Sequence, residues 1–212
     1  MEVTQKQMSS QKIQKKPGNI PEYLIYEILH GEIIYYKNYQ EVIKGKKTLE
    51  SIMGSSTLQA VLVFFFNELL IKSLDTEKYY ILSSEAGLHI DAKNNLANDI
   101  AVYDTTLLTP EKINNQYANV PPKLVIEIDV KADLSNAKNQ DYVHKKTQKL
   151  LDFGSEKVIW VFTETQKVMT ATPTENWQIM DWNKDVVLFE NLTFNIAKYL
   201  DKRRIEVGKE DI

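Results

Sequence analysis

The eight residues from Leu124 to Lys131 limit what this chain can fold into more than any other segment. Their sequence, LVIEIDVK, has the apolar and β-branched character of a buried strand but carries three charges. Side chains alternate between the two faces of a strand, which would put Val125, Glu127, Asp129 and Lys131 on the same face. Two carboxylates and an ammonium are therefore expected on one face of a core strand, where an unbalanced charge is costly.

A second acid, Asp99, stands at the head of the apolar strand predicted over 100–103. Carboxylates that converge from two strands need a neutralising partner, and hard cations such as Mg²⁺ or Mn²⁺ prefer carboxylate and carbonyl oxygens. We therefore predict a metal site on Asp99 and Glu127. The alternatives are that Asp99 caps a turn and that Glu127 and Asp129 line the solvent face of an edge strand.

A lysine on the helix predicted over 139–153 adds a third charge in an unexpected place. Tyr142, Lys146, Leu150 and Phe153 share one stripe of this helix by i, i+4 and i, i+3 spacing, so Lys146 is expected to face inward. An ammonium beside an acidic cluster can orient a water or stabilise charge on a phosphate. The alternative is that Lys146 extends out to solvent from a half-buried position.

The remaining periodicities predict an α/β fold, with a mixed central β-sheet flanked by helices and an N-terminal β-hairpin turning at His30-Gly31. Strands are expected over 23–28, 32–36, 79–83, 88–90, 100–103, 123–130, 158–162, 167–171 and 177–180. Helices are expected from Ser55 or Ser56 to about Leu74, over 139–153 up to the stop at Gly154, and over 194–200. We expect a disordered tail over 1–18, a single domain over 19–200 and a charged tail over 201–212.

Several classes of protein are disfavoured by composition. The absence of cysteine excludes disulfides and zinc–thiolate sites, and the three histidines are scattered. The net charge of −3 does not suit a protein that coats nucleic acid. No apolar stretch is long enough to span a membrane and no secretion signal is present, so a cytoplasmic protein is expected.

The ordered set of motifs resembles the PD-(D/E)XK restriction-endonuclease-like superfamily. More narrowly it resembles the Uma family, a group of restriction-endonuclease-like bacterial proteins. The resemblance covers roughly Tyr23 to Met169. It rests on the opening hairpin at 26–33, the aspartate strand at 98–103, the glutamate strand at 121–128, Lys146 on its helix, the glycine stop at 153–154 and the aromatic strand at 158–161.

The sequence departs from the family pattern at three places. Asn98 replaces the proline before the aspartate, and Gln59 stands where relatives often have a histidine near the start of the long helix. The superfamily lysine usually follows its acid by two residues, but Asp129 occupies that position after Glu127. Relatives in the family carry this lysine on the helix, which favours Lys146, with Asp129 and Lys131 as alternates. Glu27 and Glu85 are expected to support the site rather than to react.

The resemblance implies a metal-dependent endonuclease that hydrolyses phosphodiester bonds in nucleic acid, with DNA as the expected substrate. Asp99, Glu127 and the carbonyl of Ile128 would hold Mg²⁺, or Mn²⁺ in its place, and Lys146 would orient the attacking water. Two alternatives remain: an inactive nucleic-acid-binding or scaffold module of the same fold, and a hydrolase of small phosphoesters. Pairing into a homodimer, as in many superfamily members, is left open, and no membrane partner is expected.

Overall fold

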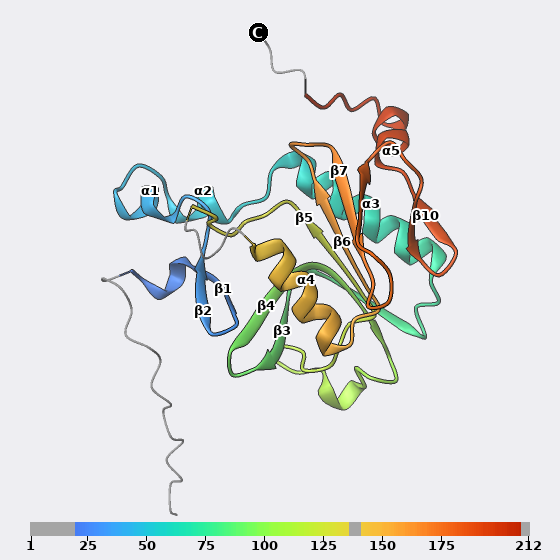
Figure 1. The fold of residues 1–212 in the computed structure, drawn as a ribbon, viewed down its shortest axis with the longest axis horizontal. Coiled ribbons are helices and arrows are strands. Elements are labelled where there is room, and N and C mark those ends of the chain that lie inside the picture. The colour runs from blue at the N-terminus through green and yellow to red at the C-terminus, as the bar shows by residue number, and fades with distance from the viewer. Residues whose placement is uncertain (1–19, 136–140, 209–212) are drawn as a thin grey trace, which may run out of the picture.

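The computed structural model describes residues 20–135 and 141–208, which form a central sheet with helices on both faces (Figure 1). This architecture confirms the predicted fold class and the N-terminal hairpin. The predicted tail over 1–18, the start of the helix predicted from residue 139 and the last four residues of the predicted C-terminal tail lie outside the described residues. The proposed domain boundaries stay a prediction.

The main sheet has eight strands in the order β2-β1-β4-β5-β6-β7-β8, with β3 paired to β4. Only the pairing of β5 with β6 is parallel among the described strand pairs. The strands are β1 (Ile25–Leu29), β2 (Glu32–Tyr35), β3 (Tyr79–Asp91), β4 (Asn94–Asp104), β5 (Leu124–Ile128), β6 (Lys157–Phe162), β7 (Lys167–Ala171) and β8 (Gln178–Asp181). A second sheet pairs β9 (Val186–Phe189) with β10 (Leu192–Phe194).

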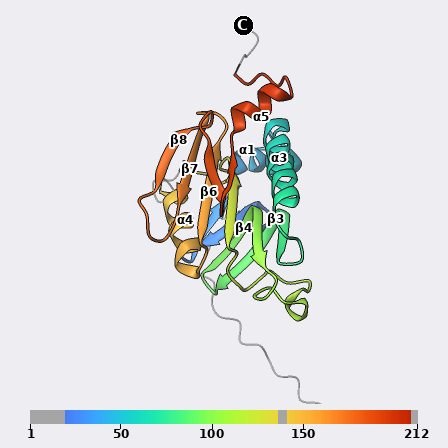
Figure 2. The ribbon, with the colours of Figure 1, turned by 90° about the vertical axis from the view of Figure 1, so that its right-hand side faces the viewer.

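Two longer helices cover opposite faces of the sheet (Figure 2). On one face α3 (Thr57–Ser73) packs Leu62, Phe66 and Leu70 against Ile100, Val102 and Ile126. On the other face α4 (Tyr142–Phe153) packs Tyr142 and Leu150 against Val125, Val158 and Trp160. The shorter helices are η1 (Glu22–Leu24), α1 (Tyr39–Ile43), α2 (Leu49–Met53), η2 (Pro110–Lys112) and α5 (Ile196–Lys202). In the described part of the chain, none is long and apolar enough to cross a membrane.

The position of α4 follows from the parallel pairing of β5 and β6. Parallel neighbours need a crossover connection, most often a helix that packs back onto the sheet. Here the crossover from β5 to β6 contains α4, so its inward stripe lies over the strand that carries Glu127. Sheet topology thereby brings Lys146 and Glu127 to the same layer of the structure.

Most predicted elements are confirmed, with differences at their ends. The three short strands expected over 79–83, 88–90 and 100–103 are parts of the long β3–β4 hairpin, whose register shifts between Ser83 and Ala86. The strand expected over 123–130 ends at Ile128, because Asp129 takes a left-handed backbone conformation with φ of 62°. The pattern did not predict α1, α2 or the β9–β10 pair.

Helix α4 ends as predicted at Gly154, which adopts φ of 119°. A Cβ at this position would lie 3.2 Å from the side chain of Pro121, in a backbone conformation that L residues avoid. We expect Gly154→Ala to lower the free energy of unfolding by about 1–2 kcal/mol. Gly54 serves as a matched control because its φ of −64° suits any residue. Chemical denaturation of both variants measures the difference, and equal stabilities would contradict the account.

Candidate active site

The register between β4 and β5 brings the two predicted acids together. The antiparallel ladder between these strands runs to the pair of Ile100 with Ile126, so Asp99 and Glu127 each lie directly beyond its last pair. The main-chain N–H of Ile128, next to Glu127, donates to the Asp99 carboxylate. Both carboxylates are buried, with exposed fractions of 9% for Asp99 and 1% for Glu127.

Asp99 is held by the end of β5 and the start of α3. Its Oδ2 accepts a hydrogen bond of 2.8 Å from the main-chain N–H of Ile128. The side-chain amide of Gln59 donates to the Ile128 carbonyl at 2.9 Å and lies 3.5 Å from each oxygen of Asp99. Burial raises the pKa of Asp99, while the N–H of Ile128 and the charge of Lys131 oppose this rise. The Gln59 amide thus contacts two of the three groups that would hold a cation, Asp99 and the Ile128 carbonyl.

Glu127 lies deeper, between the sheet and α4. Burial raises its pKa from an ordinary value of 4.5 to about 8, and the charges of Asp99 and Glu27 act in the same direction against that of Lys146. Lys146 Nζ lies 3.1 Å from Glu127 Oε1. Within the described residues no other donor reaches this buried oxygen. A carboxylate left in this state suits an additional positive charge.

Lys146 faces inward as the helical spacing predicted, and its side chain is completely buried. Its ammonium donates to the carbonyl of Ala97 at 2.7 Å and to Glu27 Oε2 at 3.2 Å, in addition to the ion pair with Glu127. Burial lowers the pKa of Lys146. The carboxylates of Glu127 and Glu27 together raise it by more than burial lowers it, so the net shift of the pKa is upward. The alternative in which Lys146 extends to solvent is therefore wrong.

Glu27 and Tyr142 complete the buried cluster. The hydroxyl of Tyr142 donates to Glu27 Oε1 at 2.6 Å, and the N–H of Ala97 donates to Glu27 Oε2 at 3.3 Å. The sequence predicted a supporting role for Glu27 but no role in the site for Tyr142, which precedes Lys146 by one helical turn. Its position on the same inward stripe was the available signal.

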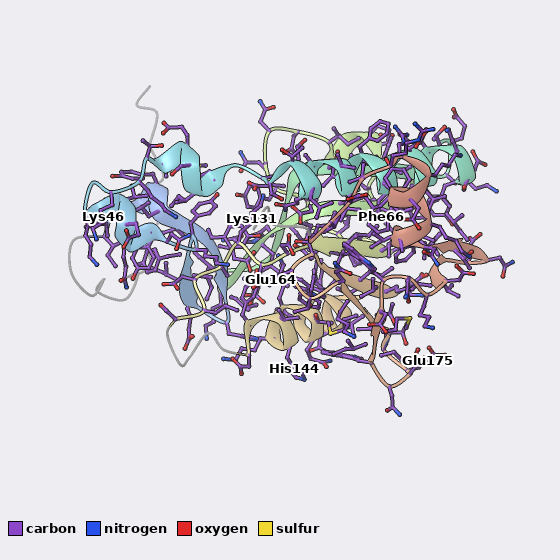
Figure 3. All side chains as sticks on the ribbon, turned by 90° about the horizontal axis from the view of Figure 1, so that it is seen from above. Lys46, Phe66, Lys131, His144, Glu164 and Glu175 are labelled. Atoms are coloured by element: carbon purple, nitrogen blue, oxygen red, sulfur yellow. The ribbon has the colours of Figure 1, made fainter. Side chains whose placement is uncertain are left out.

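Lys131 lies nearer the surface, between the layers of α3 and α4 (Figure 3). Its ammonium binds Glu85 at 2.6 Å and lies 3.8 Å from Asp99 Oδ1, and its side chain is 12% exposed. Asp129 points elsewhere, because both of its oxygens accept hydrogen bonds of 2.7 Å from the main chain and hydroxyl of Thr163. The structure thus brings together Asp99, Glu127, Ile128, Lys146 and Lys131 but engages Asp129 in a loop contact.

The oxygen donors at this position fit a magnesium ion better than a zinc ion. Within residues 20–135 and 141–208, no three acidic, histidine or cysteine side chains converge closely enough to hold a metal. Asp99, Glu127 and the Ile128 carbonyl instead supply two carboxylates and one main-chain oxygen. Magnesium is commonly held by one or two carboxylates and keeps several waters, so this small donor set is sufficient for it. Glu127 Oε1, whose one close contact among the described residues is the Lys146 ammonium, keeps a lone pair for such an ion.

Asn98, next to Asp99, is fully buried, and neither atom of its side-chain amide has a hydrogen-bond partner in the described structure. Nothing in the structure explains why an amide occupies this position, and no sequence pattern predicted its isolation.

Comparison with solved structures shows which fold the chain shares. It is similar to a crystal structure from Anabaena variabilis ATCC 29413, described as a "putative nuclease belonging to DUF820", with a TM-score of 0.57 and 17% identity over 82% of this chain and 89% of that chain. A cryo-electron microscopy structure of a DrdV–DNA complex matches with a TM-score of 0.35 and 16% identity, over 67% of this chain and 11% of that one. No family model matches the chain. No curated protein matches it either. The chain therefore shares its mixed α/β fold with the Anabaena variabilis protein.

The raised pKa of Glu127 predicts a pH-dependent stability. Between pH 4.5 and about 8 this group is ionised in the unfolded chain but still holds its proton in the folded chain, so a rise in pH favours unfolding. Glutamine does not titrate in this range. We therefore expect the free energy of unfolding of Glu127→Gln to rise relative to that of wild type as pH rises, by at least about 1 kcal/mol at pH 8 without metal.

Denaturation of wild type and Glu127→Gln in EDTA at pH 5, 6.5 and 8 measures this difference. Glu77→Gln, which alters an exposed carboxylate, controls for the loss of a charge. Parallel pH profiles for wild type and Glu127→Gln would contradict the assigned burial of an acid.

Proposed function

We propose that this chain is a metal-dependent nuclease of the Uma family that hydrolyses phosphodiester bonds in nucleic acid, with DNA as its expected substrate. The observation that carries the proposal is the buried group of Asp99, Glu127 and Lys146 in a fold shared with a protein described as a nuclease. Buried charges are costly, and their clustering with shifted pKa values is typical of functional sites.

Asp99, Glu127 and the main-chain carbonyl of Ile128 would hold Mg²⁺ or Mn²⁺. When bound, such an ion supplies an activated water at neutral pH and stabilises charge on the phosphate. Gln59 fixes the donor atoms, because its amide binds the Ile128 carbonyl and faces both oxygens of Asp99. The N–H of Ile128 orients the Asp99 carboxylate from the other side.

The two lysines take different roles in this proposal. Three oxygens lie within 3.2 Å of the buried Lys146 ammonium, which leaves it no free direction toward a substrate. Lys146 therefore positions Glu127 and opposes the rise in its pKa that burial causes. Lys131 is partly exposed, has one short contact to Glu85 and lies close to Asp99. Its ammonium would bind a non-bridging oxygen of the phosphate.

Plasmid cleavage with Mg²⁺ or Mn²⁺ tests the proposed activity. Wild type is expected to nick or linearise the plasmid and to be silent in EDTA. Asp99→Ala and Glu127→Ala should each lower the rate by about a thousandfold, because cation and activated water are lost together. Asp201→Ala, an exposed acid on α5, is the matched control and should cleave as wild type does. A wild type as silent as its site variants would contradict the nuclease and favour the inactive binding module.

Comparison of Lys131→Ala with Lys146→Met tests the division between the lysines. Lys131→Ala should slow cleavage by about a hundredfold with little change in melting temperature, because its side chain is near the surface. Lys146→Met should lower both the rate and the melting temperature, since it leaves Glu27 and Glu127 buried without their cation. Full activity of Lys131→Ala would contradict this division and favour Lys146 as the catalytic lysine.

A further inference from the structure

A cavity of about 690 Å³ opens beside the proposed active site. Strands β1 and β4 and the loop over 115–119 supply its walls. Glu27 and Ala97, which bind Lys146, also line this cavity. The cavity therefore borders the acidic site through Glu27 and Ala97.

The cavity wall carries amides and rings rather than cations. Its polar side chains are those of Tyr26, His89, Asn95, Asn115, Gln116, Tyr117 and Asn119, together with one acid, Glu27. The oxygens of Glu27 are already bound by Tyr142 and Lys146. Among the described residues that line it, none is lysine or arginine. Amides both donate and accept hydrogen bonds, as the edges of nucleobases do, whereas a phosphate would call for positive charge. The chemistry suits a planar, uncharged, polar group.

Tyr117 is held in place by the glycine beneath it. A Cβ on Gly87 would lie only 2.4 Å from the tyrosine ring, so the ring packs directly on the glycine backbone. The main chain of Ala118 fixes the loop on both sides, donating to Gly87 at 3.0 Å and accepting from His89 at 2.8 Å. Tyr117 as a whole is still 57% exposed, which leaves its side chain available for stacking. Base stacking on such rings is a common mode of binding single strands.

The distance to the proposed metal site suits neighbouring parts of one strand. Ala97 lines the cavity, and Asp99 follows it by two residues on β4, which corresponds to about 7 Å along a strand. A nucleotide base bound in the cavity would therefore be close to a phosphate bound at Asp99.

We propose that this cavity binds an unpaired nucleobase of the strand being cut, stacked on Tyr117 and bonded to the surrounding amides. The proposal rests on the nuclease function proposed above and adds to it that the substrate is single-stranded, or locally unpaired, at the site of cleavage.

Binding without cleavage tests this proposal. Two fluorescently labelled DNA strands of 12 nucleotides, one of mixed sequence and one abasic, are titrated with protein in EDTA. Fluorescence anisotropy measures the binding of each. Wild type should bind the strand with bases about tenfold more tightly than the abasic strand. Tyr117→Ala and Gly87→Ala should lose this preference, and Tyr117→Phe should keep it. Tyr23→Ala removes a tyrosine with a matching exposure of 58% outside the cavity and should also keep it.

Equal binding of the two strands by wild type, or a preference that survives in Tyr117→Ala, would overturn the proposal. If free nucleosides displace the strand at concentrations similar to that of the strand, the cavity binds free nucleosides rather than a base of a strand, and the proposal is overturned. If the protein cleaves plasmid but binds the abasic strand as tightly as the strand with bases, the role of the cavity is contradicted and the nuclease function is not. A base preference in a chain that never cleaves would support the cavity and contradict the nuclease.

Discussion

The buried ammonium of Lys146 is the charge on which the rest of the site depends. It is completely enclosed, within 3.2 Å of Glu27, Glu127 and the Ala97 carbonyl, which belong to β1, β5 and β4. Removing one partner from such a group leaves a buried charge without balance, at a cost of about 3–5 kcal/mol. The ammonium thus connects three strands to α4 and holds Glu127 in a position where burial opposes its ionisation.

The buried charges at this position lower stability but serve the proposed function. An apolar cluster between α4 and the sheet would serve the fold as well, and replacement of buried ion pairs by apolar groups is often stabilising. The chain instead keeps two carboxylates and a lysine among Tyr26, Tyr142 and Trp160, whose ring centres are each 5.8 Å from the ammonium. Such an arrangement is expected where a buried acid must be ready to bind a cation.

Alternating and helical patterns predicted the sheet, both long helices and the inward lysine because each is repeated over many residues. The meeting of Asp99 with Glu127 was expected from charge on apolar strands, and the β4–β5 register confirms that they are neighbours. The face of Asp129 was predicted wrongly. Alternation holds only within a strand, and the left-handed turn at Asp129 directs it to Thr163. Tyr142 shares the inward stripe of Lys146, but its contact with Glu27, like that of Gln59 with Ile128, depends on the packing of distant segments, which a local pattern does not predict.

The most direct test of the metal site is a crystal structure of the protein soaked in Mn²⁺, with anomalous diffraction used to locate the ion. The account predicts one manganese ion bound by oxygens of Asp99, Glu127 and Ile128, with Gln59 moved or turned to make room for it. Anomalous density that is absent from this position in protein that cleaves DNA, or that lies on other residues, would contradict the assignment.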